Sequence, residues 1–357
     1  MLSRHGSEAT GRKQKPAFVQ GECRRMGMEL AKDTSLRAID GLATAALPRW
    51  GLERAAATLI NHSENWTYRV TPAGGGRPVI LRIHRSDYHT TDGIRSELAW
   101  MRALQAEAAV KTPQAIPGVD GADIQFVETA QIPSGHNCVL FEFIDGSEPP
   151  QDELVKPFRQ LGEVTARCHT HSQTWERPPY FERLCWDFEH SFGASANWGQ
   201  WQDGPDCTPE RQRLLQRAVD LMERRLARFG KGSDRYGLIH ADFRLANLLV
   251  HEGDVRVIDF DDCGLGWFLY DAATAVSFFE DRADVPELME AWKEGYRRQR
   301  DLPAEDEDEL WTFILMRRMT LFAWMGSHSE TELARTEGPG YSTGTCELAE
   351  RYLSQYG

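Results

Sequence analysis

The spacing of apolar and polar residues predicts short strands in the first part of the chain and long helices in the second. Two short β-rich runs flank a glycine-rich turn at residues 72–76, which predicts a hairpin with a loose loop. A helix follows, because its apolar residues recur at i, i+4, i+7 and i+10. The elements predicted for this part are helices at Leu42 to Leu47 and Ile94 to Gln105, and strands at Trp66 to Val70, Val79 to Ile83 and Val139 to Ile144.

After Pro149-Pro150 the pattern changes to long helices. A predicted hairpin, Leu248 to Val250 and Val255 to Ile258, interrupts them. The change predicts a domain boundary near residue 146, with a disordered tail at 1–36, one domain at 37–146 and a second at 147–357. The predicted helices are Glu153 to His171, Pro209 to Phe229, Ala272 to Phe279, Pro286 to Arg300 and Glu309 to Met325.

Composition narrows the class of partner. A formal net charge of -13 disfavours nucleic acid, which needs clustered positive charge, and suits a cationic substrate better. No apolar run approaches the roughly 18 residues of a membrane span, so we expect a cytoplasmic protein without a membrane partner. The seven cysteines form no CxxC pair and are expected to be reduced thiols. The pattern specifies no oligomeric state.

The strongest chemical signal is the run Leu238 to Asn247 followed by Asp259. Gly253 lies six residues from both Asn247 and Asp259, so a hairpin centred there places these two side chains roughly opposite each other. Their amide and carboxylate oxygens are hard ligands that suit Mg²⁺ when phosphates and water complete the octahedron. Asp242 is then near enough to orient and deprotonate a hydroxyl nucleophile. The alternative is a surface hairpin whose polar side chains only cap turns.

A second polar pair is predicted in the first part of the chain. Alternation in the strand Val79 to Ile83 separates Arg82 from the apolar face, and Glu97 falls inside the apolar arc of its helix. A carboxylate buried there is costly unless it is paired. An ordinary surface ion pair is the alternative, and Arg85 is a second candidate for the basic partner.

The pattern HxDxxxxN followed by an aspartate on the next strand resembles the catalytic loop and metal-binding aspartate of protein kinases. The continuation from Ile258 through Ala273 is closer to the aminoglycoside phosphotransferases, a superfamily that includes choline kinases, homoserine-kinase-like enzymes and stress response kinase A. The resemblance covers most of residues 55–330. It implies an α+β, bilobal protein-kinase-like fold, with a small mixed β-sheet in the N-lobe and a mainly helical C-lobe.

The resemblance also implies roles for individual residues. Asp242 would be the catalytic base, His240 would support its loop, and Arg244 matches the position of a phosphate-contacting lysine. Asn247 and Asp259 would hold magnesium. On the nucleotide side the implied residues are Arg82 where kinases usually have lysine, Glu97 as its partner, Ser63 in a polar turn that replaces a glycine-rich loop, and Phe141 and Phe143 at the hinge. For the segment 61–66, a plain connecting turn remains the alternative.

Two other groups of residues suggest binding. Tryptophans and acidic residues crowd one region and could recognise an ammonium group, although most such tryptophans are core residues. His169 and His171 suggest a transition-metal site, but side chains two apart on a helix point about 200° apart, so we interpret the pair as a solvated helix end. The crowded region contains Trp175, Trp186, Trp198, Trp201, Asp187, Glu189 and Asp203.

The resulting prediction is a small-molecule kinase that transfers the terminal phosphoryl group of ATP, with Mg²⁺, to a hydroxyl of a small and preferably amine-bearing metabolite or antibiotic. Its partners are therefore a nucleotide and a small hydroxylated substrate. Two alternatives remain open: a pseudokinase that binds nucleotide or a partner protein without turnover, and a metal-dependent phosphoesterase.

Overall fold

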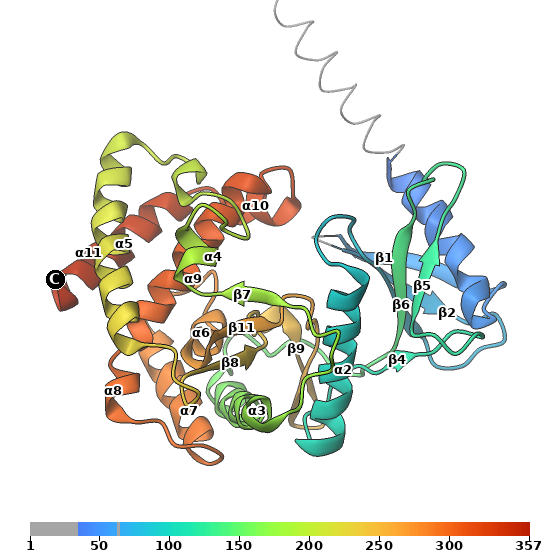
Figure 1. Ribbon diagram of the computed structural model, residues 1–357, viewed down its shortest axis with the longest axis horizontal. Helices are drawn as coiled ribbons and strands as arrows, with labels where there is room; N and C mark the ends of the chain where they lie inside the picture. Colours follow the sequence, from blue (N-terminus) through green and yellow to red (C-terminus); the bar gives the residue numbers. More distant parts are fainter. Residues whose placement is uncertain (1–34, 63–64) are drawn as a thin grey trace, which may run out of the picture.

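A computed structural model describes residues 35–62 and 65–357, which form two lobes (Figure 1). The expected tail, residues 1–36, lies outside the described residues except for 35 and 36, which belong to a helix over residues 35–46. The remaining N-lobe elements are η1 (Leu47–Trp50), β1 (Ala56–His62), β2 (Trp66–Thr71), β3 (Val79–Ile83), α2 (Thr91–Glu107), β4 (Ala115–Ile116), β5 (Ile124–Val127) and β6 (His136–Glu142).

The N-lobe is built on one antiparallel sheet. Its strand order is β1-β2-β3-β6-β4, with β5 also paired to β6, and each pair that the structure describes is antiparallel rather than mixed. Alternate side chains of β2 and β3 pack on the helix of residues 35–46; this core includes Leu42, Tyr68 and Leu81. The sheet thereby holds the ends of β1, β2 and β3 at the edge that faces the C-lobe.

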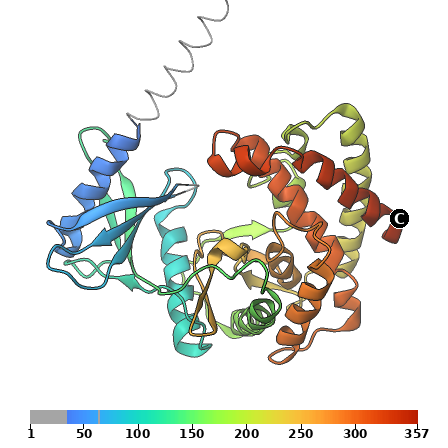
Figure 2. The same cartoon turned by 180° about the vertical axis from the view of Figure 1, so that it is seen from behind.

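Helix α2 lies between the sheet and the C-lobe in both views (Figures 1 and 2). Thr90 caps its N-terminus by accepting a hydrogen bond from Gly93 N at 3.0 Å. Its predicted apolar face, including Ile94 and Leu98, is buried in the same core cluster as the C-lobe residues. Glu97 lies on this buried part of the helix and is therefore carried toward the cleft between the lobes.

One segment connects the lobes. β6 ends at Glu142 and α3 begins at Val155, and within the connection Ser147 forms a bridge to Val250 of the C-lobe. The boundary expected near residue 146 falls in this segment and stays a prediction.

The C-lobe is mainly helical and contains two small sheets. β9 and β10 form the predicted hairpin, and β11 pairs in parallel with β7 and antiparallel with β8. Its elements are α3 (Val155–Thr174), β7 (Leu184–Trp186), α4 (Phe188–Phe192), η2 (Trp201–Asp203), α5 (Pro209–Phe229), β8 (Tyr236–Ile239), η3 (Leu245–Asn247), β9 (Leu248–His251), β10 (Asp254–Val257), β11 (Gly264–Trp267), α6 (Phe268–Thr274), α7 (Val285–Arg297), α8 (Ala304–Glu307), α9 (Leu310–Ser327), α10 (Glu332–Glu337) and α11 (Tyr341–Tyr356).

The predicted fold class is confirmed, and two helices differ most from their predicted bounds. The helix predicted at Leu42 to Leu47 covers residues 35–46. The helix predicted at Ala272 to Phe279 is α6, which begins at Phe268 and ends at Thr274, before a series of turns. The described cysteines are free thiols, as predicted. Among the helices described, none combines the length and apolar character that a bilayer span requires.

Candidate active site

The loop after β8 carries the predicted base and is held by Asp271 of α6. The carboxylate of Asp271 accepts hydrogen bonds from the N–H of His240 at 3.0 Å and of Ala241 at 2.6 Å. Ala241 has φ 67°, a left-handed conformation that costs a non-glycine residue about 1–3 kcal/mol and persists only where its surroundings fix it. The loop is therefore locked in a strained shape that turns Asp242 toward the cleft.

His240 connects this loop to Ile258, the residue that precedes Asp259. Its Nδ1 accepts a hydrogen bond from the N–H of Asp242 at 3.2 Å, and its Nε2 lies 3.2 Å from the carbonyl oxygen of Ile258. One ring nitrogen accepts a hydrogen bond while the other donates one, which is the pattern of a neutral imidazole. Complete burial also lowers the pKa of His240, which favours the same neutral form. His240 thus holds two parts of the site together without contributing charge.

Three side chains from the C-lobe fix the carboxylate of Asp242. Oδ2 accepts hydrogen bonds from Asn247 Nδ2 at 2.7 Å and Arg244 Nε at 3.2 Å, while Arg317 Nη2 donates to Oδ1. Burial alone would raise the pKa of Asp242, but the guanidinium groups of Arg244 and Arg317 outweigh it and the pKa lies below its ordinary value. Asp242 is therefore an ionised hydrogen-bond acceptor at neutral pH.

The β9–β10 hairpin forms, but its register differs by one residue from the predicted one. Leu248 pairs with Val257, and the N–H of Ile258 donates to the carbonyl oxygen of Asn247 at 3.0 Å, so Ile258 lies opposite Asn247 and Asp259 is the next residue along the chain. A metal site shared by Asn247 and Asp259 stays a prediction. Asp242 and Asn247 are 9% and 4% exposed, so the alternative of a surface hairpin with turn-capping side chains is wrong. Asp259 itself has φ 64°, a second strained position beside the cleft.

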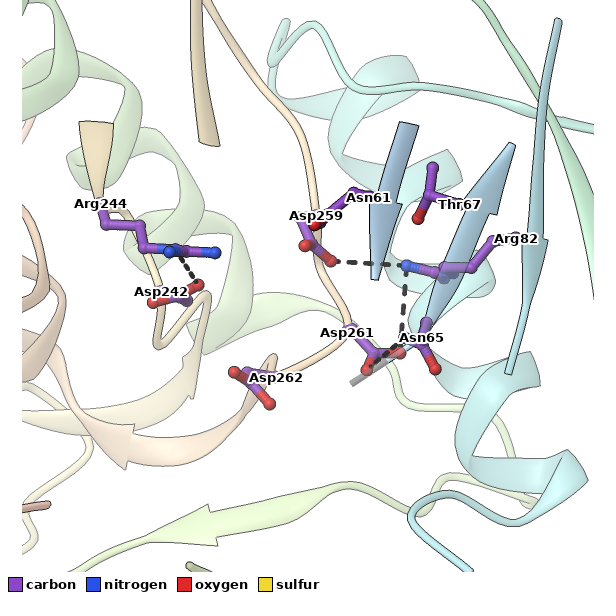
Figure 3. Close-up of a pocket in the computed structure, with 9 residues that line it drawn as sticks. All are labelled: Asn61, Asn65, Thr67, Arg82, Asp242, Arg244, Asp259, Asp261 and Asp262. Carbon is purple, nitrogen blue, oxygen red and sulfur yellow. Dashed lines mark hydrogen bonds and ion pairs between the residues drawn. The ribbon is translucent and has the colours of Figure 1, made fainter. Parts of the chain in front are cut away.

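These side chains meet strands of the N-lobe across one polar pocket (Figure 3). Figure 3 shows Asp242 and Arg244 on one side, Arg82 on the other, and Asp259 and Asp261 between them. Four carboxylates and two guanidinium groups line the pocket, so its excess charge is negative. The lining residues are Asn61, Asn65, Thr67, Arg82, Asp242, Arg244, Asp259, Asp261 and Asp262.

Asp259 differs from Asp242 and Asp261 because its pKa is raised rather than lowered. Burial in the cleft raises its pKa to about 7 against the attraction of Arg82, and the negative charges of Asp261 and Asp242 add to the increase. The pocket therefore accommodates added positive charge readily, because a bound cation would favour the ionised form of this carboxyl group.

Arg82 and Glu97 form a buried ion pair. Arg82 Nη2 lies 2.5 Å from Glu97 Oε1, and the side chains are 8% and 0% exposed, so the alternative of a surface ion pair is wrong. The second arm of the guanidinium, Nη1, lies 3.6 Å from Asp259 and 3.9 Å from Asp261. The forked side chain thus joins helix α2 to the segment that follows β10.

The other nucleotide-side predictions have different outcomes. Arg85 does not replace Arg82: its guanidinium stacks 4.6 Å from the ring centroid of Tyr88, and Nη1 lies 3.2 Å from His328 Nε2. The ring of Phe141 lies 4.8 Å from the Arg82 guanidinium, and Phe143 lies beyond the last residue of β6, in the connection between the lobes. Ser63 lies outside the described residues.

None of the seven residues in the predicted cluster of tryptophans and acidic residues lines the pocket around Asp242. Trp186 and Trp201 are buried core residues, and Asp187 is bound by His190 at 2.6 Å and Lys231 at 2.6 Å. Trp198 is different, because its Nε1 donates to Tyr88 OH at 3.3 Å beside the pocket.

The interpretation of His169 and His171 as a solvated helix end is wrong. His169 is completely buried, with Nε2 3.1 Å from Asp271, and His171 is 8% exposed, with Nε2 3.1 Å from Glu107. The two rings do point to different partners, as their helical spacing requires. Within residues 35–62 and 65–357, no group of three or more His, Cys, Asp or Glu residues could hold a metal ion, so the Mg²⁺ prediction depends on the mixed pair Asn247 and Asp259.

Sequence reasoning missed Arg317 and Tyr88. Arg317 and the arginine beside it are the charged residues of the largely apolar helix α9. A charge in such a helix requires a partner, and this signal could have identified Arg317. Tyr88 donates to Asp262 Oδ1 at 2.5 Å from the loop after β3. No periodic pattern marks that loop, so the sequence held no comparable signal for it.

The fold and the polar pocket together define a two-lobed kinase. A family model described as the phosphotransferase enzyme family matches residues 56–310. Amicoumacin kinase of Bacillus subtilis (strain 168) is 25% identical over 283 residues, which cover 76% of this chain and 78% of that protein. The chain therefore belongs to the phosphotransferase enzyme family.

Solved structures agree with this assignment. A microcompartment-associated aminopropanol kinase is 44% identical, and the match covers 89% of this chain and 98% of that one with a TM-score of 0.81. A choline/ethanolamine kinase family protein from Mesorhizobium loti shares the fold at 14% identity and a TM-score of 0.59, covering 87% of this chain and 97% of that one. This chain is an ATP-dependent phosphotransferase with an alcohol group as acceptor, and its substrate is a small molecule.

Proposed function

We propose that this chain transfers the γ-phosphoryl group of ATP to the hydroxyl group of a small amino alcohol, with Mg²⁺ at the nucleotide phosphates. The observation that carries the proposal is the excess of carboxylates in the pocket around Asp242, which favours a metal ion and an ammonium group together. The 44% identity to an aminopropanol kinase over 98% of that chain supports the same class of acceptor.

Asp242 receives the acceptor hydroxyl in this proposal. The hydroxyl oxygen forms a bond to the γ-phosphorus while the bond from phosphorus to the β,γ-bridging oxygen breaks, and that electron pair leaves on ADP. The hydroxyl proton passes to Asp242. Because Asp242 is ionised and held by three side chains, it orients the hydroxyl for in-line attack rather than acting as a strong base. Arg244 lies beside it, at the position proposed to contact phosphate.

Asn247 and Asp259 would hold the Mg²⁺. Asn247 uses its amide nitrogen for two hydrogen bonds, to the main-chain oxygen of Asp242 at 2.9 Å and to its carboxylate, so the amide oxygen is the atom left for a cation. Asp259 supplies a carboxylate that burial and its neighbours keep partly protonated without a cation. When bound, Mg²⁺ would neutralise charge on the phosphate oxygens.

The N-lobe supplies the nucleotide contacts. Arg82 is proposed to bind a phosphate oxygen while Glu97 holds its other arm, in the role that lysine has in most kinases. The backbone of Phe141 is used by the sheet through its pairing with β3 and β4, so the adenine edge is assigned to the backbone after Glu142, beginning with Phe143. The role of Ser63 at the phosphates stays a prediction.

Asp262 is the proposed ammonium ligand. It lines the pocket with Asp242, and Tyr88 and Trp198 form a hydrogen-bonded chain that holds it. The rings of Tyr88 and Trp198 already have guanidinium groups over them, at 4.6 Å and 5.4 Å, so we assign the amine to the carboxylate of Asp262 rather than to either aromatic ring.

The test compares ADP release with 1-amino-2-propanol, ethanolamine and the amine-free 1,2-propanediol. We expect the amino alcohols to be preferred, and Asp262→Asn to raise the KM for the amine by about 10- to 100-fold, the effect of losing one hydrogen bond to a charged group, without changing that for the diol. Asp242→Asn, as the control, should abolish turnover. Equal rates of ADP release with 1,2-propanediol and with the amino alcohols would refute the proposal that the acceptor is an amino alcohol. Phosphate release from a phosphoester without ATP would instead support a phosphoesterase, and nucleotide binding without turnover a pseudokinase.

A further inference from the structure

Arg317 reaches the base from the interior of the C-lobe. It lies in the middle of α9, its side chain is 1% exposed, and it does not line the pocket. All three of its nitrogens donate hydrogen bonds: Nε to Ser277 Oγ at 3.0 Å, Nη1 to the carbonyl oxygen of Ala241 at 3.2 Å, and Nη2 to Asp242 Oδ1. It therefore acts on the reaction only through the groups that it holds.

The groups that Arg317 holds, rather than its burial, indicate its role. Burying an ion pair contributes little net stability, because removing both groups from water offsets their attraction, and an apolar replacement is often as stable. Arg317 instead bonds Ala241, the residue with the strained backbone, and the reacting carboxylate beside it. The ring centroids of Trp198 and Tyr270 lie 5.4 Å and 5.9 Å from the guanidinium carbon of Arg317, and these rings restrict the position of the guanidinium further.

The donors around Asp242 leave one oxygen for the substrate. A carboxylate has about four lone-pair sites, two on each oxygen. Within the part of the chain that the structure describes, Oδ2 has two donors, Asn247 and Arg244, whereas Oδ1 has one, Arg317. The open acceptor site is therefore on Oδ1, the oxygen that Arg317 holds.

We propose that Arg317 is a positioning residue that fixes Oδ1 of Asp242 as the atom that accepts the substrate hydroxyl. The inference rests on the proposed function, since it needs a hydroxyl acceptor, and it extends that function by assigning the reacting oxygen and the residue that aims it. The guanidinium fork is essential to it, because lysine cannot make three directed hydrogen bonds in one plane.

Arg318, the next residue of α9, provides a matched control. It is 6% exposed and also makes three hydrogen bonds, to Thr345, Glu280 and the carbonyl oxygen of Tyr341. It also stacks on an aromatic ring, that of Tyr341. These contacts resemble those of Arg317 in number and burial, but none of them involves the catalytic loop.

The test compares Arg317→Lys with Arg318→Lys in the full chain, by steady-state kinetics and thermal unfolding. We expect both to lose similar stability. Arg317→Lys should lower kcat about 100-fold, because the reacting carboxylate is then misplaced, and the KM for ATP should stay unchanged. Arg318→Lys should keep the wild-type kcat. Ser277→Ala provides a second variant in case Arg317→Lys does not fold. It removes the Nε anchor together with the hydrogen bond from Ser277 Oγ to the carbonyl oxygen of Thr274, and it should lower kcat several-fold.

Each outcome decides the inference. Equal kcat losses in the two lysine variants, or a loss that appears in the KM for ATP instead, would overturn it, as would an unchanged kcat in Ser277→Ala. A wild-type protein that phosphorylates no hydroxyl would refute the proposed function itself, so the two failures are distinguishable.

Discussion

The buried ion pair between Arg82 and Glu97 can be broken by removing either charge. Glu97→Gln removes the negative charge, and Arg82→Met removes the positive charge. Loss of one partner from a buried pair costs about 3–5 kcal/mol, because the other charge is left uncompensated. In Glu97→Gln the guanidinium keeps Asp259 and Asp261 within 3.6 and 3.9 Å, so we expect about 3 kcal/mol. In Arg82→Met the carboxylate stays fully buried and loses this partner, so we expect about 5 kcal/mol.

The free energy of unfolding from urea denaturation measures this difference. Arg82→Lys is the control, because it keeps the charge beside Glu97 but removes the arm that points to Asp259, and it should cost less than either variant. In the kinetic assay Arg82→Met should lower kcat/KM for ATP about 10- to 100-fold, the effect of one lost hydrogen bond to a charged group. A Glu97→Gln variant as unstable as Arg82→Met, or losses below about 1 kcal/mol in both, would refute the reasoning, since they are typical of a solvated pair.

Three further substitutions test other parts of the structure. Asp259→Asn should leave stability unchanged or raise it, because burial in the cleft and the charges of Asp261 and Asp242 disfavour the ionised carboxylate despite the attraction of Arg82. A Mg²⁺ titration of this variant should show a half-activating concentration raised at least about 10- to 100-fold. Asp271→Asn should destabilise the fold by about 1–3 kcal/mol and lower kcat, since an amide N–H₂ replaces an oxygen that accepts backbone N–H groups; an unchanged melting temperature and kcat would contradict this. Gly162→Ala should lower the free energy of unfolding, measured by thermal unfolding, by about 1–3 kcal/mol or more, because the added Cβ would lie 2.0 Å from the carbonyl oxygen of Trp292. The control is Gly41→Ala, whose added Cβ meets nothing within 4 Å and should not destabilise the fold.

The site was predictable where local pattern and chemistry coincide. Asn247 and Asp259 flank a hairpin whose turn contains Gly253, and strand pairing places Ile258, the residue before Asp259, opposite Asn247. Glu97 was identified because a carboxylate within an apolar helical arc requires a partner, and the burial of Arg82 beside it agrees with that argument.

What the sequence did not reveal depends on contacts between distant segments. Arg317 meets Asp242 across 75 positions, and His169 meets Asp271 across 102, so neither local spacing nor periodicity indicated the partner. The strands β7 and β11 were missed because they are three and four residues long, and β11 contains two glycines, which weaken any strand pattern. The helix α11 also went unpredicted; an apolar face that includes Leu348 and Tyr352 packs it on α5 and α9.

Phosphorus NMR of a reaction with ATP, Mg²⁺ and 1-amino-2-propanol observes the transferred group itself. We expect a new phosphomonoester signal that grows in step with ADP, and its absence in the Asp242→Asn variant. Orthophosphate as the sole new product, or the same ester formed by Asp242→Asn, would contradict phosphoryl transfer to a hydroxyl oriented by this carboxylate.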